Sequence, residues 1–146
     1  MKKVLLFVYI LLSFCSCLNY IPCRGQDYII EGITHQELIN KFNELRENYP
    51  EYKSMTKDSE NEYVPHYYIE LNWKDLGIGV SCDIHIGDQI PNPPTHLKFT
   101  LIRDSIGYKD INSKDIDKKT NKMYKEKFEK EILDRMELEW SRESCW

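Results

Sequence analysis

Apolar and polar residues alternate strictly through three segments in the middle of the chain. These segments run from Tyr67 to Trp73, from Ile78 to Ile86 and from Leu97 to Leu101. An alternation of period two places all the apolar side chains on one face of a β-strand. The residues expected to point into the core are Tyr67, Ile69, Leu71 and Trp73 in the first strand, Ile78, Val80, Cys82, Ile84 and Ile86 in the second, and Leu97, Phe99 and Leu101 in the third.

The first two of these strands are separated by four residues, Lys74 to Gly77, which are typical of a turn. If the strands form a hairpin across this turn, residues whose numbers sum to 151 lie opposite each other. This register pairs Ile69 with Cys82 on the apolar face, and it pairs apolar residues with apolar residues throughout. One apolar and one polar face predict an antiparallel sheet that is covered on a single side.

A helix is predicted to begin after Thr34. The segment from Thr34 to Glu37 matches a capping box, in which each side chain accepts a hydrogen bond from the other residue's backbone. Ile33 and Leu38 occupy the positions of a hydrophobic staple, and Pro50 ends the helix. The apolar stripe consists of Leu38, Ile39, Phe42, Leu45 and Tyr49.

A long C-terminal helix is predicted from about residue 115 to residue 141, with Asn112 or Ser113 as its cap. Oppositely charged residues recur at spacing i,i+4 along it, which indicates a solvated face without a functional role. Its apolar stripe is expected to contain Ile116, Met123, Tyr124, Phe128, Ile132, Leu133, Met136 and Trp140.

In chain order these elements are a helix, three strands and a second helix. Because each strand has one apolar face and each helix has one apolar stripe, we expect an α+β two-layer sandwich. In this arrangement, α-β-β-β-α in chain order, both helices cover the same face of a three-stranded antiparallel meander. The folded domain is expected to span residues 32–146.

The N-terminus has the pattern of a signal peptide. Lys2 and Lys3 precede an unbroken apolar run from Val4 to Leu12. A run of this length suits the apolar region of a secretory signal and is shorter than the roughly 20 residues that span a bilayer. We therefore expect residues 1–16 to be removed on export and residues 17–31, with the helix and strand breakers Pro22 and Gly25, to form a tether.

The end of this leader, Phe14-Cys15-Ser16-Cys17, resembles the lipobox of bacterial lipoproteins. The resemblance covers only the first 17 residues, and Phe14 departs from the aliphatic residue of the pattern. It implies that Cys17 becomes acylated and that the protein is anchored in the cell envelope, facing the periplasm, with the outer membrane as the expected site. The alternative is ordinary cleavage before Ser16, which would release a soluble secreted protein.

Charge and motifs exclude several classes of function. The formal net charge is −4 for the full chain, and loss of two lysines with the leader makes it −6. An acidic chain without a basic cluster is not expected to bind nucleic acid. The chain also has no glycine-rich phosphate loop, nucleophile elbow or His-Glu-x-x-His motif, so an enzyme is not expected.

Export to the oxidising periplasm would allow the remaining cysteines to form a disulfide. Three remain after Cys15 and the acylated Cys17 are set aside: Cys23, Cys82 and Cys145. Cys23 and Cys145 flank the domain and are the expected pair if a disulfide forms. Cys82 points inward from a strand and is expected to act as a small hydrophobic residue.

One group of polar residues is a candidate metal site. The proposed register places His66 opposite His85 on the polar face, beside Asp83, and His96 starts the next strand on the same face. Three imidazoles and a carboxylate are a ligand set for zinc or copper. The competing interpretation is that these are ordinary solvated histidines, and no cofactor is then required.

Two kinds of binding module remain for the function. The first is a protein-binding accessory, similar in role to an immunity or inhibitor protein, which meets another envelope protein or a toxin-like protein. The second holds a glycan or small molecule against exposed tyrosines, for which Tyr52, Tyr63, Tyr68 and Tyr108 are the candidates. A third alternative is metal-assisted hydrolysis at the histidines.

Overall fold

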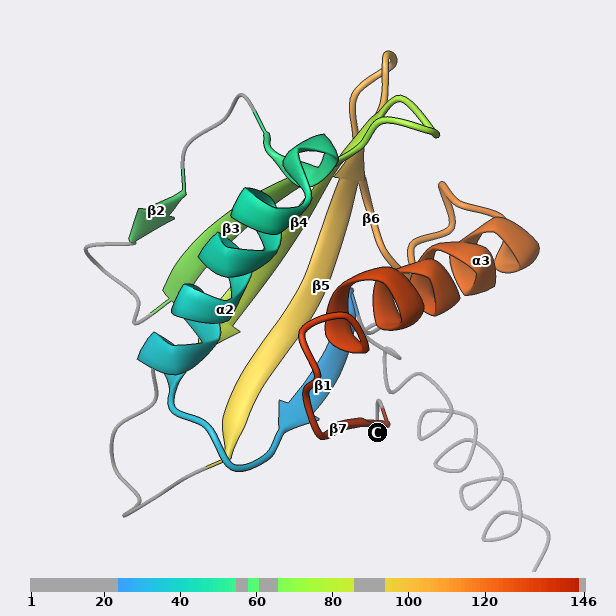
Figure 1. The fold of residues 1–146 in the computed structure, drawn as a ribbon. Helices are drawn as coiled ribbons and strands as arrows, with labels where there is room; N and C mark the ends of the chain where they lie inside the picture. The colour runs from blue at the N-terminus through green and yellow to red at the C-terminus, as the bar shows by residue number, and fades with distance from the viewer. Residues whose placement is uncertain (1–23, 55–57, 61–65, 86–93, 145–146) are drawn as a thin grey trace, which may run out of the picture.

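The computed structural model describes residues 24–54, 58–60, 66–85 and 94–144. The leader, Cys17, the Cys23–Cys145 pairing, Tyr63 and Ile86 lie outside these residues. Within them the chain has a mixed α+β fold, with an antiparallel sheet and two α-helices (Figure 1). No helix in this part of the chain is both long and apolar enough to cross a membrane.

The described residues form a seven-stranded sheet in which every pair of neighbours is antiparallel. The order is β2-β3-β4-β5-β1-β7, and β6 pairs with β5. The sequence pattern predicted only β3, β4 and β5. The strands are β1 (Gln26–Ile30), β2 (Ser59–Glu60), β3 (His66–Trp73), β4 (Ile78–His85), β5 (Thr95–Arg103), β6 (Tyr108–Asp110) and β7 (Trp140–Arg142).

The β3–β4 hairpin has the predicted register. Ile69 lies opposite Cys82, and His66 lies opposite His85, so the paired numbers sum to 151 along the whole hairpin. Gly77 ends the turn with a φ of 66°, a conformation that glycine adopts without strain. The predicted register is confirmed. It could be predicted because the strand period and the turn both depend on residues close together in the sequence.

Strand β5 departs from the predicted alternation at Thr100. Ser81 pairs with Leu101 whereas the next residue, Cys82, pairs with Phe99, so Thr100 is an extra residue in a β-bulge. The bulge shifts the alternation by one position. Ile102 is consequently buried in place of Leu101, and the prediction that Leu101 points into the core is wrong.

The predicted tether is wrong from residue 26 onward. Residues 26–30 form β1, which lies between β5 and β7 inside the sheet. Tyr28 and Ile30 are fully buried, and they alternate with Asp27 and Ile29 on the other face. Two apolar residues at period two were too short a pattern to identify a strand whose partners lie far away in the sequence.

Helix α2 (His35–Asn48) begins as predicted. The Glu37 amide donates to Thr34 Oγ1 (3.2 Å), and the Thr34 amide donates to Glu37 Oε2 (2.7 Å), which completes the capping box. Leu38, Ile39, Phe42 and Leu45 are buried, but Tyr49 lies past the helix end and is exposed. A 3₁₀ turn, η1 (Pro50–Tyr52), follows and brings Tyr52 into the core.

Helix α3 (Lys118–Phe128) is shorter than predicted. Its cap is Asp117, which accepts from the amides of Lys119 and Thr120, so Asn112 and Ser113 are not the cap. It continues only as one π-helical turn, η2 (Glu129–Leu133). The chain then turns through Glu137, which has a φ of 54°, and returns to the sheet as β7, whereas a helix to Ser141 had been predicted.

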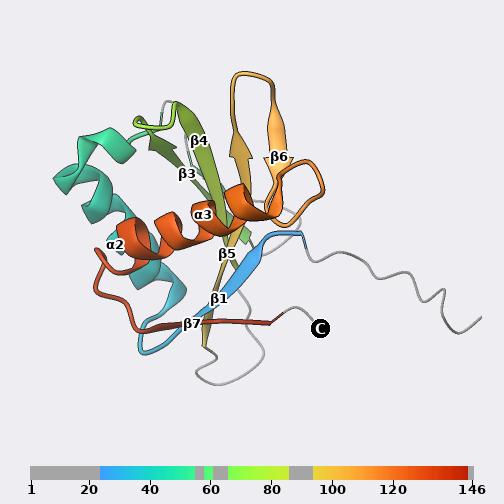
Figure 2. The same ribbon diagram turned by 90° about the vertical axis from the view of Figure 1, so that its right-hand side faces the viewer.

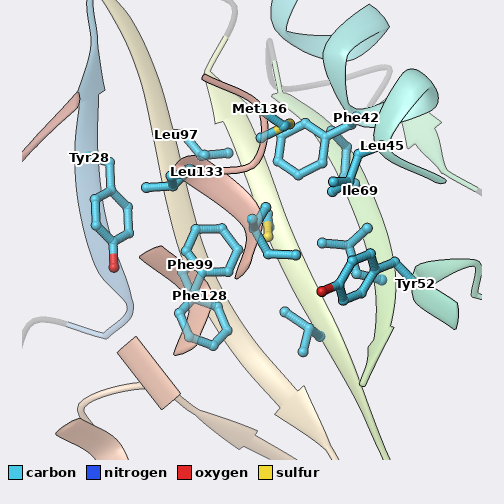
Figure 3. Packing of buried hydrophobic residues seen from close by; sticks show 14 of the residues in the cluster. Tyr28, Phe42, Leu45, Tyr52, Ile69, Leu97, Phe99, Phe128, Leu133 and Met136 are labelled. Carbon is cyan, nitrogen blue, oxygen red and sulfur yellow. The ribbon is translucent and has the colours of Figure 1, made fainter. Parts of the chain in front are cut away.

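Both helices lie in front of the sheet in Figure 1, and Figure 2 shows the same arrangement from the side. The core lies between the helices and the sheet, as Figure 3 shows. Phe99 of β5 stacks on Phe128 of α3 with ring centroids 4.7 Å apart. Met123, predicted in the buried stripe of α3, is instead 44% exposed.

Candidate functional site

The sheet face that points away from the helices gathers histidine, carboxylate and lysine side chains from several strands. We call it the outer face. Its side chains come from four neighbouring strands, β3, β4, β5 and β1, and are only partly buried in most cases. Its members are Asp27, Ile29, His66, Tyr68, Glu70, Ser81, Asp83, His85, His96, Lys98 and Arg103.

A row of three histidines crosses the outer face. His66 in β3 lies opposite His85 in β4, which lies opposite His96 in β5. His66 Nε2 is 3.2 Å from His85 Nδ1, and the two rings meet edge to face with centroids 4.9 Å apart. The ring of His96 turns to the other side, where its Nδ1 lies 3.6 Å from Glu143 Oε2. The structure therefore joins two of the three imidazoles.

The His66 imidazole is held in a partly buried position. Burial lowers its pKa, and the neighbouring His85 and Lys98 lower it further because they disfavour a second positive charge. Its ring stacks on Tyr68, with centroids 6.3 Å apart. The other ring nitrogen, Nδ1, is buried and has no hydrogen-bond partner among the described residues.

Asp83 lies beside this pair, opposite Tyr68. Burial raises the pKa of its carboxyl to about 6, although the nearby Lys98 acts in the opposite direction. Its Oδ1 is also buried, and no group in the described part of the chain forms a hydrogen bond with it. Two buried polar atoms without partners, one on His66 and one on Asp83, thus occur within the same part of the outer face.

The other charged groups nearby are paired. Lys98 Nζ lies 3.7 Å from Asp27 Oδ2, and Ser81 Oγ donates to Glu70 Oε1 at 2.5 Å. At the β3 edge Asp58 accepts two hydrogen bonds from the Arg46 guanidinium, at 2.8 and 2.6 Å, and a third from the Glu70 amide, at 3.2 Å. These contacts orient the charged side chains of the outer face and of its β3 edge.

The predicted four-ligand metal site is not assembled in the structure. Among the described residues, no three His, Cys, Asp or Glu side chains converge in a way that would hold a metal ion. His66 and His85 are brought together as predicted from the register. Asp83 and His96 share the outer face with them but do not complete a ligand group.

The predicted set of exposed tyrosines is also not formed. Tyr52 is 4% exposed and its hydroxyl donates to Glu131, so its ring is not accessible to a ligand. Tyr68 is half-buried on the outer face, and Tyr108, 68% exposed, lies in β6. Sequence analysis missed Ile106, which is 85% exposed in the β5–β6 turn, because an apolar residue in a turn has no periodicity to identify it.

Two further chemically relevant side chains, Glu129 and Cys82, are buried. Glu129 is 8% exposed and accepts from the Tyr28 hydroxyl and from Arg142, an arrangement that no sequence pattern had predicted. Cys82 is fully buried and unpaired, as expected for a small hydrophobic residue. Burial raises the pKa of its thiol, which makes it a poor nucleophile.

Comparison of the chain with protein-family models, with curated proteins and with solved structures finds no match.

Proposed function

We propose that the protein is an exported, lipid-anchored and non-catalytic module that binds another protein through its outer face. The observation that carries the proposal is the position of both α-helices on the opposite side of the sheet, so that the polar side chains of four strands share one broad surface. The finer architecture that we infer is a two-layer sandwich, in which the inner face builds the core and the outer face serves a partner.

The composition of the outer face favours a protein partner over a small molecule. It combines half-buried side chains such as Tyr68 and Lys98 with the exposed imidazole of His85, on a sheet held by long antiparallel pairings. Tyrosine is enriched among the residues that dominate binding energy in protein interfaces. The described thiol, Cys82, is buried, and this supports a non-catalytic role.

Charge indicates the kind of partner. The outer face carries the carboxyl groups of Asp27, Glu70 and Asp83 against the ammonium group of Lys98 and the guanidinium group of Arg103, whose side chain lies over Gly79. The chain as a whole is −6 after loss of the two leader lysines. A basic protein is therefore the expected partner, because opposite charges accelerate encounter and exclude wrong partners. This suits an immunity- or inhibitor-like role.

The location is tested at Cys17. In the intact chain expressed in a bacterium, Cys17→Ala should move the protein from the membrane fraction to the soluble periplasmic fraction, because a lipid anchor supplies about 0.8 kcal/mol per buried CH₂. Ser16→Ala, which keeps a small residue at the lipobox, is the matched control and should remain in the membrane. Equal membrane retention of Cys17→Ala would refute the lipid assignment.

Binding is tested with two single variants and an envelope extract. The wild-type chain should capture one stoichiometric basic protein by affinity purification and cross-linking. Tyr68→Ala should weaken this capture at least about tenfold, since a hot-spot side chain contributes more than about 1.4 kcal/mol. Met123→Ala, on the exposed side of α3, should leave it unchanged. Equal capture by both variants would show that the outer face is not the interface.

A further inference from the structure

His66 and His85 present ring nitrogens to each other on two paired strands, with Nε2 of His66 3.2 Å from Nδ1 of His85. We propose that these two nitrogens chelate a divalent cation of the Cu²⁺, Ni²⁺ or Zn²⁺ class. The site goes beyond the proposed protein-binding role and does not depend on it. It also differs from the four-ligand set expected from the sequence, because it requires only the two imidazoles that the structure brings together.

The distance between the nitrogens suits two ligands of one ion. Metal–imidazole bonds are about 2.0–2.1 Å long, so two adjacent ligands have nitrogens about 2.9 Å apart in octahedral geometry and about 3.3 Å apart in tetrahedral geometry. The observed 3.2 Å lies between these values. Binding therefore requires a rotation of the rings that directs both lone pairs at the ion and little change in their separation.

The backbone holds the pair in place before any ion arrives. His66 and His85 are directly opposite in a hairpin whose strands pair over eight residues each. β4 is in turn paired with β5 on its other side. Two imidazoles on directly opposed sheet positions have closely spaced Cβ atoms, about 4.5–5.5 Å apart. The backbone order needed for chelation is thus already present in the fold.

The surroundings favour a cation of intermediate softness. His85 is exposed, which gives the ion access, and the carboxyl group of Asp83 lies on the same face two residues away. Lys98 acts against binding, but Asp27 lies 3.7 Å from it and offsets its charge. Imidazole nitrogens favour Cu²⁺, Ni²⁺ and Zn²⁺, whereas Mg²⁺ and Ca²⁺ favour oxygen ligands.

The two imidazole rings can chelate an ion without losing a proton. Each neutral imidazole carries one N–H, and a hydrogen bond across the 3.2 Å contact uses one of these two hydrogens, with the donor set by the tautomer. Chelation uses the lone pairs of His66 Nε2 and His85 Nδ1, so both hydrogens must reside on the opposite ring nitrogens. This is a change of tautomer and releases no proton when both rings are neutral. His96 is available as a third ligand only if its contact with Glu143 opens.

The test is a titration of the intact chain, purified in detergent, with Cu²⁺, Ni²⁺ and Zn²⁺ by calorimetry. His66→Asn and His85→Asn should each weaken binding at least about tenfold, since even a lost supporting contact costs about 10–100-fold in metal affinity. His35→Asn, at the start of α2, is the matched control and should bind like the wild type. Affinity should fall from Cu²⁺ to Zn²⁺, and Mg²⁺ should not compete.

Further outcomes distinguish metal binding by the two histidines from binding by cysteine thiols and from loss of binding because a variant misfolds. Binding that all four chains retain equally comes from cysteines or other groups and would overturn the proposal. Circular dichroism of each variant in a chelator checks the fold. If a histidine variant does not fold, the wild-type chain is titrated with Ni²⁺ and followed by NMR instead, and the ring resonances of His66 and His85 should shift. Shifts at His35 alone, or at no histidine, would equally overturn the proposal.

Discussion

Arg142 in β7 binds Glu129 at the start of η2 through two nitrogens. Nε lies 2.5 Å from Oε1, and Nη2 lies 2.8 Å from Oε2. The Tyr28 hydroxyl donates to the same Oε1 at 3.0 Å. A buried carboxylate needs such partners, because an unpaired charge in the interior is costly. The contact links the last strand to the helix and to β1, and so stabilises the return of the chain to the sheet.

Replacing Arg142 should therefore destabilise the fold. We expect Arg142→Ala to lower the free energy of unfolding by about 1–2 kcal/mol, because it removes charged hydrogen bonds that water can only partly replace. The Arg142 side chain is 45% exposed, which keeps the loss below that of a fully buried pair. Urea unfolding followed by circular dichroism measures it. Lys122→Ala, whose ion pair with Glu126 is solvent-exposed, should cost less than about 0.5 kcal/mol.

The capping box of α2 gives a second prediction. Thr34→Ala should lower the free energy of unfolding by about 1 kcal/mol, since the Glu37 amide loses its acceptor. The exposed Gln36→Ala should have a smaller effect. An equal effect of the two substitutions would show that the cap contributes little.

The same substitution should change the titration of Glu37. Hydrogen bonds from the Thr34 amide and then from its hydroxyl lower the pKa of the Glu37 carboxyl. A lowered carboxyl pKa stabilises the fold above the unfolded value, and this stabilisation is lost as the pH falls through the folded value. In Thr34→Ala we expect the Glu37 pKa to rise part of the way toward 4.5, as measured by NMR titration, because the amide donor remains. An unchanged pKa would contradict this assignment.

Local patterns predicted the elements that carry the candidate site. The alternation through β3 and β4 and the turn at Gly77 determined the register, and the register placed His66 opposite His85. The side-chain directions did not follow from it. His96 occupies the predicted position but turns toward Glu143, a residue near the C-terminus that no sequence spacing connected to it.

Elements that depend on distant partners escaped prediction. β1 and β7 are five and three residues long. They are strands because β1 pairs with β5 on one side and with β7 on the other. The π-helical turn at Glu129 and the bulge at Thr100 each change the periodicity by local geometry that composition does not reveal. The bulge moves burial from Leu101 to Ile102. In the C-terminal helical segment, by contrast, Met123 is exposed although predicted to be buried, and the predicted Ile132, Leu133 and Met136 are buried.

The α3 stripe supplies a fourth prediction, because sequence and structure disagree about Met123. Phe128 is fully buried between Tyr28 and Phe99, so Phe128→Ala should lower the free energy of unfolding by about 3–5 kcal/mol. Met123→Ala should change it by less than about 0.5 kcal/mol, since the side chain is mostly in water. Chemical denaturation of both variants decides the matter. Comparable losses would favour the helix predicted from the sequence over the observed one.

The thiol of Cys82 provides the last prediction. It is fully buried at the centre of the sheet, and burial, followed by the nearby Asp83, Glu70 and Asp58 carboxylates, raises its pKa. Since only the thiolate reacts, and only an opened structure exposes it, alkylation by iodoacetamide should be limited by unfolding. Mass spectrometry of the peptide that contains Cys82 should detect no modification in native buffer and complete modification in urea. Rapid native alkylation would mean that β4 opens locally between β3 and β5, and the rigid hairpin on which the His66–His85 site depends would then be wrong as well.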